Sequence, residues 1–473
     1  MKKSTGVLAL LVALAAVYTG ASWYVGQQTE TAIREQVNQA NEYLLQQGEQ
    51  AKLELSSYER SLFSSSARYV LSFNVPDEPE TFELVFADRI AHGPIPFAAG
   101  YYAPAMAVSH IELQNNDTVA PWFALTDGKV PVYADTHISW AGKASSVVEW
   151  VPFKKNQEER NIDFSGGQIL VDVDRKAQQY SGRFSFDHFL LDSVSDQPIK
   201  MTLKALHGDF DYSGQLYVND KQSGKMTLEK VDVQAEDGAF GLKNFVITAA
   251  SETVDSFIKG TARYDIESLE IGEQDVGKLE AAFDFDRWYA PAFLQANDLL
   301  TQLSAETDLA ELSTEDKDRL AQALHLFLEH KPSINFSPIS WKNAAGETNL
   351  GLQIALQAPE DKTADLHRNV LPWVQALDLV HLDVHLSRPM IEQVLQKIAQ
   401  SDSDFDLQSA MLGVESLFNE LAETLEPMGM VKRTSDGLES RISYSQANGE
   451  VIDFNGTPVP ISDLFMLGLG LMM

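Results

Sequence analysis

The first pattern along the chain is an apolar run near its start. The run Val7–Val25 follows two lysines, Lys2 and Lys3, and holds no charged residue. At about 1.5 Å of rise per residue, a helix of this length spans the ~30 Å hydrocarbon core of a bilayer. The pattern therefore predicts a transmembrane anchor at residues 1–26, with the lysines in the cytoplasm and the rest of the chain on the other side.

Two features at the end of this run bear on whether the segment is retained as an anchor or cleaved as a signal peptide. Trp23 and Tyr24 are the residue types that favour the headgroup layer, which fits a retained anchor. The small residues Gly20, Ala21 and Ser22 also offer a cleavage site, so a removed signal peptide is the alternative. We expect a retained anchor, because the apolar run is longer than that of a usual signal peptide.

A polar stretch without proline follows at residues 27–52. Within it, Ile33, Val37, Ala40 and Leu44 recur at helical spacing and form one apolar stripe. The pattern predicts a stalk helix, whose stripe either packs on its own domain or forms the seam of a homodimer.

From residue 53 to residue 288 the period changes from helical to two. Apolar Leu279, Phe283 and Phe285 alternate with polar neighbours, as do the apolar positions of the segment 169–174. Such alternation is typical of strands with one apolar and one solvated face. We expect turns at Asn161–Gly167 and Asn219–Gly224 and no amphipathic helix. The apolar sheet face must then be covered by a second sheet, by a later helix or by a lipid chain.

Helical patterns return in the remaining segment, residues 289–473. Predicted helices begin near Tyr289 and at Ser313, and strands follow at 350–356 and 377–387. Two further predicted helices and a closing hairpin end this part at Met390–Gln400, Leu407–Leu425 and Gly437–Phe454. The predicted fold class is α+β and β-rich, with a transmembrane helix, long antiparallel sheets, and helices mainly in the C-terminal part. The four predicted parts are residues 1–26, 27–52, 53–288 and 289–473.

Composition narrows the possible partners. The 473 residues carry a formal net charge of −32, which disfavours nucleic acid as a partner. Cysteine is absent, which excludes disulfides and thiolate metal sites. No nucleotide-binding or zinc-protease motif occurs, and we expect no cofactor.

The most site-like grouping is His381, Asp383 and His385. Alternate residues of a strand share a face, so the three side chains would point the same way, and imidazoles with a carboxylate can bind zinc or iron. The alternative is the solvated face of an amphipathic strand, with Val380 and Leu382 on the buried face. We carry the three residues as a candidate metal site.

Two other groups have residue types that could carry chemistry. Asp402, Asp404 and Asp406 have the start of a calcium-loop spacing but lack its glycine and closing glutamate, and we expect them to cap a helix. His92 precedes glycine and proline, which predicts a tight turn; a role as general base has no partner defined by the sequence. The apolar tail, residues 464–473, is expected to pack on its own domain, a second copy or the membrane surface.

Three stretches resemble the YdgA-like family of bacterial envelope proteins. They are Tyr58–Ser65, His92-Gly93-Pro94, and Ile442-Ser443-Tyr444 with the later Asn-Gly pairs. Tyr58, Leu62 and Phe63 of the first stretch are expected in the core. The resemblance implies an inner-membrane protein that faces the periplasm and self-associates, with no established activity. The overall pattern also resembles AsmA-like proteins, which build long β-grooves.

The sequence thus predicts a membrane-anchored periplasmic protein without catalytic activity. It would hold a lipid chain or a protein partner on a long sheet. The alternatives are a periplasmic hydrolase with a carboxylate or metal site and a structural homodimer built on the stalk helix.

Overall fold

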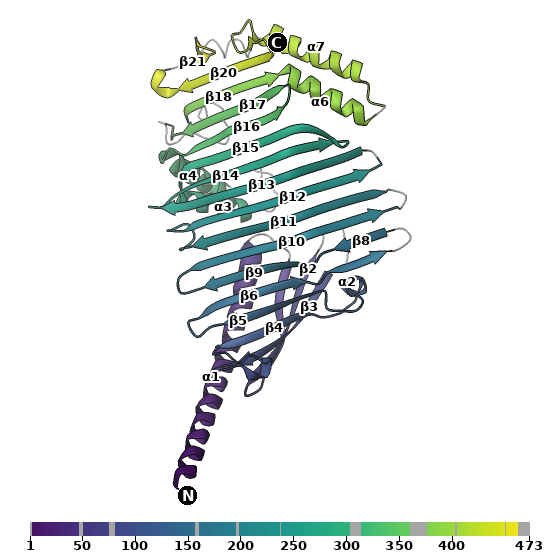
Figure 1. Cartoon of the computed structure of the whole chain (residues 1–473). Helices are drawn as coiled ribbons and strands as arrows, with labels where there is room; N and C mark the ends of the chain where they lie inside the picture. Colours follow the sequence, from purple (N-terminus) through teal and green to yellow (C-terminus); the bar gives the residue numbers. More distant parts are fainter. Residues whose placement is uncertain are drawn as a thin grey trace. The chain divides into compact units, whose positions relative to one another are not determined.

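The computed structural model describes residues 2–46, 51–74, 81–156, 160–194, 198–236, 238–302, 314–359, 376–402, 404–449 and 451–461. Figure 1 shows the order of the elements along the chain. The chain divides into two compact units, residues 1–189 with 209–213 and residues 190–208 with 214–473. The β-rich, antiparallel character predicted from the sequence is confirmed, and four of the six described helices lie in the C-terminal part.

Unit 1 combines one long helix with an antiparallel sheet. Its elements are α1 (Lys2–Gln46), β1 (Ala51–Arg60), β2 (Ser64–Asn74), β3 (Thr81–His92), η1 (Phe97–Ala99), β4 (Ala107–Leu113), α2 (Ala120–Leu125), β5 (Val132–Ile138), β6 (Lys143–Trp150), β7 (Phe153–Asn156), β8 (Arg160–Phe164), β9 (Gly167–Asp174) and most of β10 (Gln179–Ser193). Strands β1 to β6 pair in chain order, and β9 then joins β6 to β10. The β7–β8 hairpin lies beside this order.

Unit 2 is a longer antiparallel sheet with two helical hairpins. Its elements are part of β11 (Ile199–Ser213), β12 (Lys221–Ala235), β13 (Gly238–Val254), β14 (Phe257–Ile271), β15 (Gln274–Tyr289), α3 (Ala290–Gln302), α4 (Thr314–Glu329), β16 (Ser333–Asn343), β17 (Gly346–Leu356), β18 (Leu377–Ser387), α6 (Arg388–Ser401), α7 (Leu407–Leu425), β19 (Lys432–Arg433), β20 (Gly437–Ser445), η3 (Gln446–Asn448), β21 (Val451–Phe454) and β22 (Thr457–Pro460). Strands β12 to β18 pair in chain order, and β20, β21 and β22 extend the sheet. The predicted boundary at residue 288 falls inside this unit, where β15 pairs with β16. The predicted four-part division stays a prediction.

Helix α1 packs on the sheet of unit 1, and Ile33 of the predicted stripe takes part in the contact. Val25 is fully buried in a cluster with Ile90 of β3, and Ile33 packs against that cluster. Further along, the amide of Asn41 donates to the carbonyl of Leu53 at 2.8 Å and accepts from its N–H at 2.8 Å. The stalk helix therefore lies on its own domain, which is the first of the two arrangements open to its stripe.

The membrane-spanning part of the prediction is not confirmed. Among the helical residues whose side chains the structure describes, none forms a stretch long and apolar enough to cross a membrane. Residues 7–17 of the predicted anchor lie outside that description, as does the whole apolar tail at 464–473. Both stay predictions.

Three local predictions were wrong. Residues 160–164 form strand β8 rather than a turn, because their polar side chains pair with the equally polar β7 across a short hairpin. The second predicted turn lies earlier, where Gly214 has a φ of 95° and the N–H of Gln215 donates to Asn219, and β12 begins at Lys221. The six-residue helix α2 was not expected; it buries Phe123 against Leu113 and Val119.

A fourth correction concerns the predicted core. Leu62 and Phe63, expected inside, are 42% and 39% exposed. They lie in the turn between β1 and β2, where the chain reverses and no strand covers them. Tyr58, in strand β1, is partly buried as expected.

Candidate functional site

One face of the sheet in unit 2 is apolar across many strands. The cross-strand register places apolar side chains in two neighbouring rows that run across the strands. We call these the apolar rows: Met226, Ile247, Tyr264, Ala281, Ile339, Leu350 and Val384 in the first, and Ala249, Ala262, Phe283, Phe336, Leu352, Leu382, Ile442 and Phe454 in the second. Because side chains alternate along a strand, the intervening residues point to the other face.

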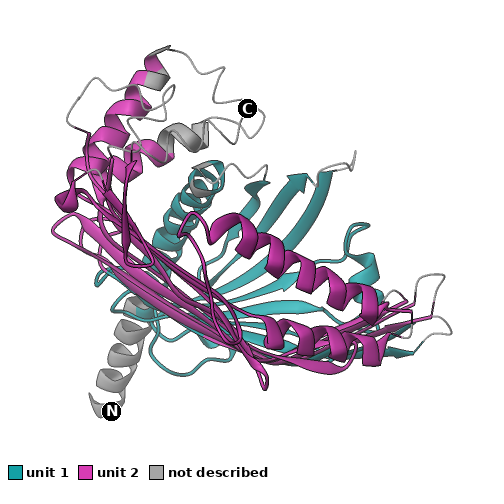
Figure 2. Ribbon diagram, turned by 90° about the horizontal axis from the view of Figure 1, so that it is seen from above, with its two compact units in different colours: residues 1–189, 209–213 teal, residues 190–208, 214–473 magenta. Residues whose placement is uncertain are grey.

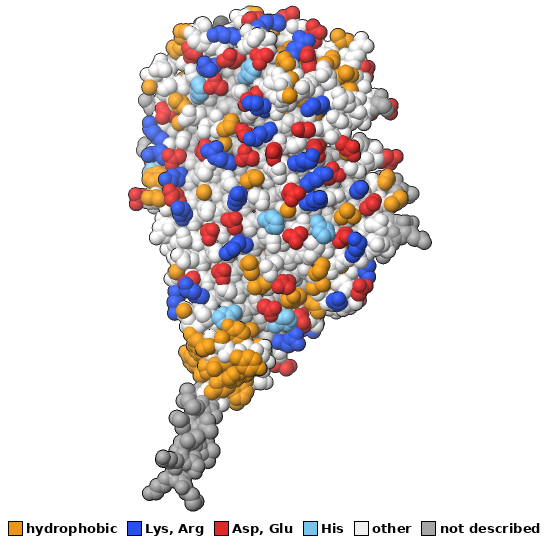
Figure 3. Space-filling model, in the orientation of Figure 1, with side chains coloured by type: hydrophobic (Ala, Val, Ile, Leu, Met, Phe, Trp, Pro, Cys, Tyr) orange, Lys and Arg blue, Asp and Glu red, His pale blue; other side chains and the backbone are white. Residues whose placement is uncertain are grey.

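The other face of the same strands is polar. Register rows on that side run through Asp284, Asn335, Gln353 and His381, among others. Figure 3 shows acidic and basic side chains mixed over this part of the molecule. The sheet therefore has one solvated and one apolar face, as the period-two pattern predicts.

Helices cover the two ends of the strands on the apolar side. Near one end, α6 buries Met390 and Val394 against Val276, with Leu269 and Trp341 packed beside them. Figure 2 shows the helices of unit 2 on one side of its curved sheet. This packing closes the apolar face at that end of the strands.

At the other end, aromatic rings join the sheet to α3 and α4. The ring centroid of Trp288 lies 5.6 Å from that of Phe293 in α3 and 5.7 Å from that of Phe327 in α4. Between the two helical hairpins the apolar rows keep contact with solvent. Tyr264 is 43% exposed and Ile339 is 38% exposed. Ordinary sheet cores bury such side chains, so this part of the face is available to a ligand.

The predicted metal residues lie on the polar face. His381, Asp383 and His385 follow one another on strand β18, with Val380 and Leu382 facing the other way, as the alternation predicts. Arg441 donates to the carboxylate of Asp383 at 2.7 Å, and this partner helps to hold the pKa of Asp383 below its ordinary value although burial acts to raise it.

His385 contacts Asp436 rather than Asp383. Its Nε2 lies 3.2 Å from the carboxylate of Asp436, outside strand β18. Among the described residues, no three His, Asp or Glu side chains lie close enough together to hold a metal ion. The metal site at His381, Asp383 and His385 stays a prediction that this geometry does not support.

The acidic run 402–406 directly precedes helix α7 and supplies its N-cap residue. The carboxylate of Asp406 accepts from the backbone N–H of Ser409 at 3.0 Å, which is an N-cap bond. The prediction of a capping role is thereby confirmed for Asp406.

The first two family stretches meet beneath helix α1. The hydroxyl of Tyr58 donates to Ser65 at 2.8 Å, and the Ser65 hydroxyl lies 2.9 Å from Nε2 of His92. His92 is fully buried, and burial lowers its pKa. The sequence could not pair residues 27 positions apart.

Helix α1 closes over this group at a glycine. A Cβ at Gly26 would lie 2.5 Å from Cε1 of His92, so only glycine lets the helix approach this closely. The Tyr58 hydroxyl also lies 3.3 Å from the Gly26 carbonyl, and Ser22 donates to the carbonyl of Gly93. The imidazole is sealed from solvent, and the group joins helix α1 to the sheet of unit 1.

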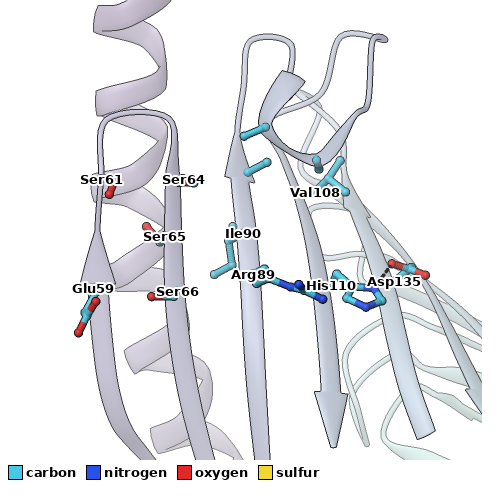
Figure 4. A pocket seen from close by; sticks show the side chains of 13 residues that line it. Glu59, Ser61, Ser64, Ser65, Ser66, Arg89, Ile90, Val108, His110 and Asp135 are labelled. Carbon is cyan, nitrogen blue, oxygen red and sulfur yellow. Dashed lines mark hydrogen bonds and ion pairs between the residues drawn. The ribbon is translucent and has the colours of Figure 1, made fainter. Parts of the chain in front are cut away.

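A cavity lined by described residues of unit 1 measures about 560 Å³. Figure 4 shows Ser61, Ser64, Ser65 and Ser66 on one side and Arg89, His110 and Asp135 on the other. His110 uses both ring nitrogens, at 2.7 Å from Asp135 and 3.0 Å from Glu112. Burial lowers the pKa of His110, but these two bonds more than reverse that effect and raise it.

A serine hydrolase needs a serine hydroxyl bonded to a histidine that a substrate can reach. In this cavity, no hydrogen bond of the described side chains joins a serine to His110, and Ser65 instead bonds to the sealed His92. The cavity therefore offers polar binding groups but no activated nucleophile.

A buried carboxylate nearby was missed by sequence reasoning. Asp88 of β3 is 3% exposed and accepts from Ser109 at 2.6 Å and from Tyr69 at 3.3 Å. Burial raises its pKa to about 6, although both hydroxyl donors lower it. In the sequence, Asp88 occupies a position of β3 where the alternating residues Leu84, Phe86 and Ile90 are apolar, and this was the only sign that its carboxylate would be buried.

The whole chain has relatives among bacterial proteins. The family model described as "Bacterial protein of unknown function (DUF945)" matches residues 1–462. Protein YdgA of Escherichia coli is 26% identical over 98% of this chain and 96% of its own length. The uncharacterized protein YihF of the same organism is 24% identical, over 78% of this chain and 80% of its own. A Haemophilus influenzae protein, also uncharacterized, is 22% identical over 60% of this chain and 82% of its own. No solved structure matches.

Proposed function

We propose, from the premise that this chain belongs to the DUF945 family of bacterial proteins of unknown function, that it is a membrane-tethered lipid-binding protein of the cell envelope. It holds an acyl chain against the apolar rows of unit 2 and catalyses no reaction. The single observation that carries the proposal is the pair of apolar rows left open between two helical hairpins.

The length of the apolar rows suits a lipid. The second row crosses eight strands, but Phe454 at its end is buried. From Ala249 to Ile442, six spacings of about 4.8 Å give a path of roughly 29 Å. This is close to the ~30 Å thickness of a bilayer's hydrocarbon core, the combined length of two opposed acyl chains. One lipid chain can therefore lie along the row without leaving the apolar surface.

The energetics also favour an acyl chain. Each methylene removed from water contributes about 0.8 kcal/mol, so ten methylenes laid on the rows supply roughly 8 kcal/mol before the costs of binding. The rows offer side chains and no free backbone groups, because each interior strand is paired on both sides. A peptide strand would need such backbone groups at a sheet edge, whereas an acyl chain needs only apolar contact.

The tether is the second part of the proposal. The uncharged residues 7–17 behind Lys2 and Lys3 support insertion in the inner membrane with a single pass and the bulk of the chain in the periplasm. Tyr18, Ser22 and Val25, at the end of the same apolar run, contact unit 1 instead. Helix α1 continues from Lys2 to Gln46 without interruption, so an inserted segment would be joined rigidly to unit 1. A homodimer stays a prediction.

The hydrolase alternative gains no support from the described residues. His381 pairs with Asp383, which also accepts from Arg441, and His385 lies against Asp436. Among the described side chains of the unit 1 cavity, no serine is bonded to His110. A lipid-binding role requires neither a metal site nor an activated serine.

The experiment compares lipid retained by three single variants of the full-length protein. Tyr264→Lys and Ile339→Lys place a charge on the exposed part of the apolar rows, and Gln353→Lys places the same charge on the exposed polar face. After gentle extraction, the lipids released on denaturation are measured by mass spectrometry. We expect about one lipid per chain in the wild type and in Gln353→Lys, and a several-fold loss in the other two.

Equal lipid content in all variants would contradict the proposal. A wild-type protein that retains no lipid after mild extraction would do so as well. Circular dichroism of each variant checks that the sheet is intact, since all three positions are solvent-exposed enough to accept lysine.

A further inference from the structure

Five aromatic side chains gather where helix α1 enters unit 1. We call them the base patch: Tyr18, Phe63, Phe97, Tyr102 and Trp140. The ring of Tyr18 lies 5.6 Å from those of both Phe63 and Phe97, and Phe97 lies 5.8 Å from Tyr102. Trp140 reaches Gly93 in the same loop, with its ring 3.0 Å from where a Cβ would stand.

The base patch is open to its surroundings. Phe63 is 39% exposed, Phe97 49%, Tyr102 76% and Trp140 49%. Large aromatic side chains in contact with one another usually form a core, and a contiguous exposed cluster marks a surface that meets something apolar.

The patch is held in a fixed arrangement. The hydroxyl of Tyr18 donates to the carbonyl of Ile95 at 2.7 Å. The loop bearing Phe97 is closed by backbone bonds from Gly93 to Met106 at 2.7 Å and from Ala105 to Pro94 at 3.0 Å. These bonds present the rings outward as part of the folded unit.

The chain segments that carry Phe63, Phe97 and Tyr102 hold no charged residue. No acidic, basic or histidine residue occurs from Gly93 through Ser109, nor from Ser61 through Ala67, in a chain of net charge −32. Figure 3 shows apolar side chains gathered at this place with no charged side chain among them. Most faces of so acidic a protein are repelled by anionic headgroups, and the base patch is a face that is not.

We infer that the base patch is a membrane seat, which rests in the headgroup layer of the bilayer from which helix α1 emerges. This rests on the tether in the proposed function. The chain itself indicates that the bilayer covers the patch. Tyr18 belongs both to the patch and to the uncharged N-terminal run, so the apolar sequence leads directly into the patch. Tyrosine and tryptophan are the side chains that prefer the headgroup layer.

Contact of the base patch with the membrane would fix how unit 1 is held above the bilayer. A helix alone would leave unit 1 free to move above the membrane, whereas a seated base sets its height and tilt. Leu62 and Phe63, which the sequence pattern placed in a protein core, instead serve this lipid-facing surface.

The test uses the absence of cysteine in the natural chain. Full-length Tyr102→Cys is labelled with an environment-sensitive fluorophore and placed in vesicles of phosphatidylethanolamine and phosphatidylglycerol that contain nitroxide-headgroup lipid. Tyr180→Cys, an exposed aromatic position of β10 in the same unit, is the matched control. We expect several-fold stronger quenching at position 102 than at position 180.

A second pair of variants tests whether the quenching depends on the aromatic side chains of the base patch. The label is moved to Trp140→Cys, alone or together with Phe97→Glu and Tyr102→Glu, and vesicle flotation reports tethering separately. We expect the two glutamates to abolish quenching while the protein still floats with the vesicles.

Equal quenching at positions 102 and 180, or quenching unchanged by the glutamates, would overturn the seat. A fluorophore shielded from water but not quenched by the lipid nitroxide would also overturn it, because it would place a protein on the patch. Loss of flotation in the unsubstituted protein would instead contradict the tether itself.

Discussion

Gly26 provides the sharpest test of how helix α1 is joined to unit 1. A methyl group at this position would meet the buried His92 ring at 2.5 Å from Cε1 and 2.7 Å from Nδ1, with Arg60 at 3.3 Å. Gly20 lies in the same helix and has no atom within 4 Å of such a methyl group. The substitutions Gly26→Ala and Gly20→Ala are therefore chemically identical and differ only in what the added carbon meets.

The expected free energies follow from these contacts. Alanine in place of glycine stabilises a helix by roughly 1 kcal/mol, and this gain applies at both positions. At Gly26 the clash costs about 1–3 kcal/mol, and displacement of His92 from Ser65 adds about 1 kcal/mol for the lost hydrogen bond. We expect Gly20→Ala to be neutral or stabilising and Gly26→Ala to destabilise unit 1 by about 1–3 kcal/mol.

The assay is denaturant unfolding of the full-length protein in mild detergent, followed by far-ultraviolet circular dichroism and by proteolysis at the β1–β3 region. A double-mutant cycle with His92→Ala adds a direct check, because removing the ring should relieve most of the cost of Gly26→Ala. Equal unfolding midpoints for Gly26→Ala and Gly20→Ala, or no coupling to His92, would refute the proposed contact.

Three further substitutions test separate parts of the account. Burial raises the pKa of Asp88 from an ordinary 3.8 to about 6, so its proton stabilises the folded state below pH 4 and that stability is lost as the pH rises through 6. Asp88→Asn should therefore raise the free energy of unfolding above pH 6 by at most about 3 kcal/mol and change little near pH 4; a stabilisation independent of pH would contradict this. Asn41→Ala removes both bonds to Leu53 and should cost about 1–3 kcal/mol, measured by hydrogen exchange at the C-terminal end of α1, with unchanged exchange as the refuting result. Asp406→Ala removes the N-cap of α7 and should lower the stability of that helix by about 0.5–2 kcal/mol, seen as faster exchange at Ser409 but not in α6.

Local patterns were enough to predict much of the sheet. The period-two alternation of Leu279, Phe283 and Phe285 identified strand β15, and that of 377–387 identified β18 with its correct solvated face. Alternation succeeds because the geometry of a strand fixes the face of every second side chain. The helices at 390–400 and 407–425 followed from their apolar period in the same way.

Contacts between distant segments could not be predicted. The approach of Gly26 to His92 depends on the path of helix α1 over β3, which no short-range pattern encodes. The buried Asp88 depends equally on hydroxyl donors from two other strands. The exposure of Phe63 was missed because an apolar residue beside a turn has the same local signal whether protein or lipid covers it.

The same limit applies to the candidate site. The sequence raised a lipid chain as one possible cover for the apolar sheet face, but only the cross-strand register aligns Tyr264, Ala281 and Ile339 into one row. It also drew attention to His381 and His385, whose partners include a residue from elsewhere in unit 2.

The most direct measurement of the central proposal is photo-crosslinking in membranes with a phospholipid that carries a diazirine near the end of its acyl chain. Peptides of the full-length protein are then mapped by mass spectrometry. We predict crosslinks within the apolar rows, at residues such as Tyr264 and Ile339, in addition to the N-terminal segment. Crosslinks confined to the N-terminal segment and the base patch, with none in β12 to β18, would contradict lipid binding on the sheet.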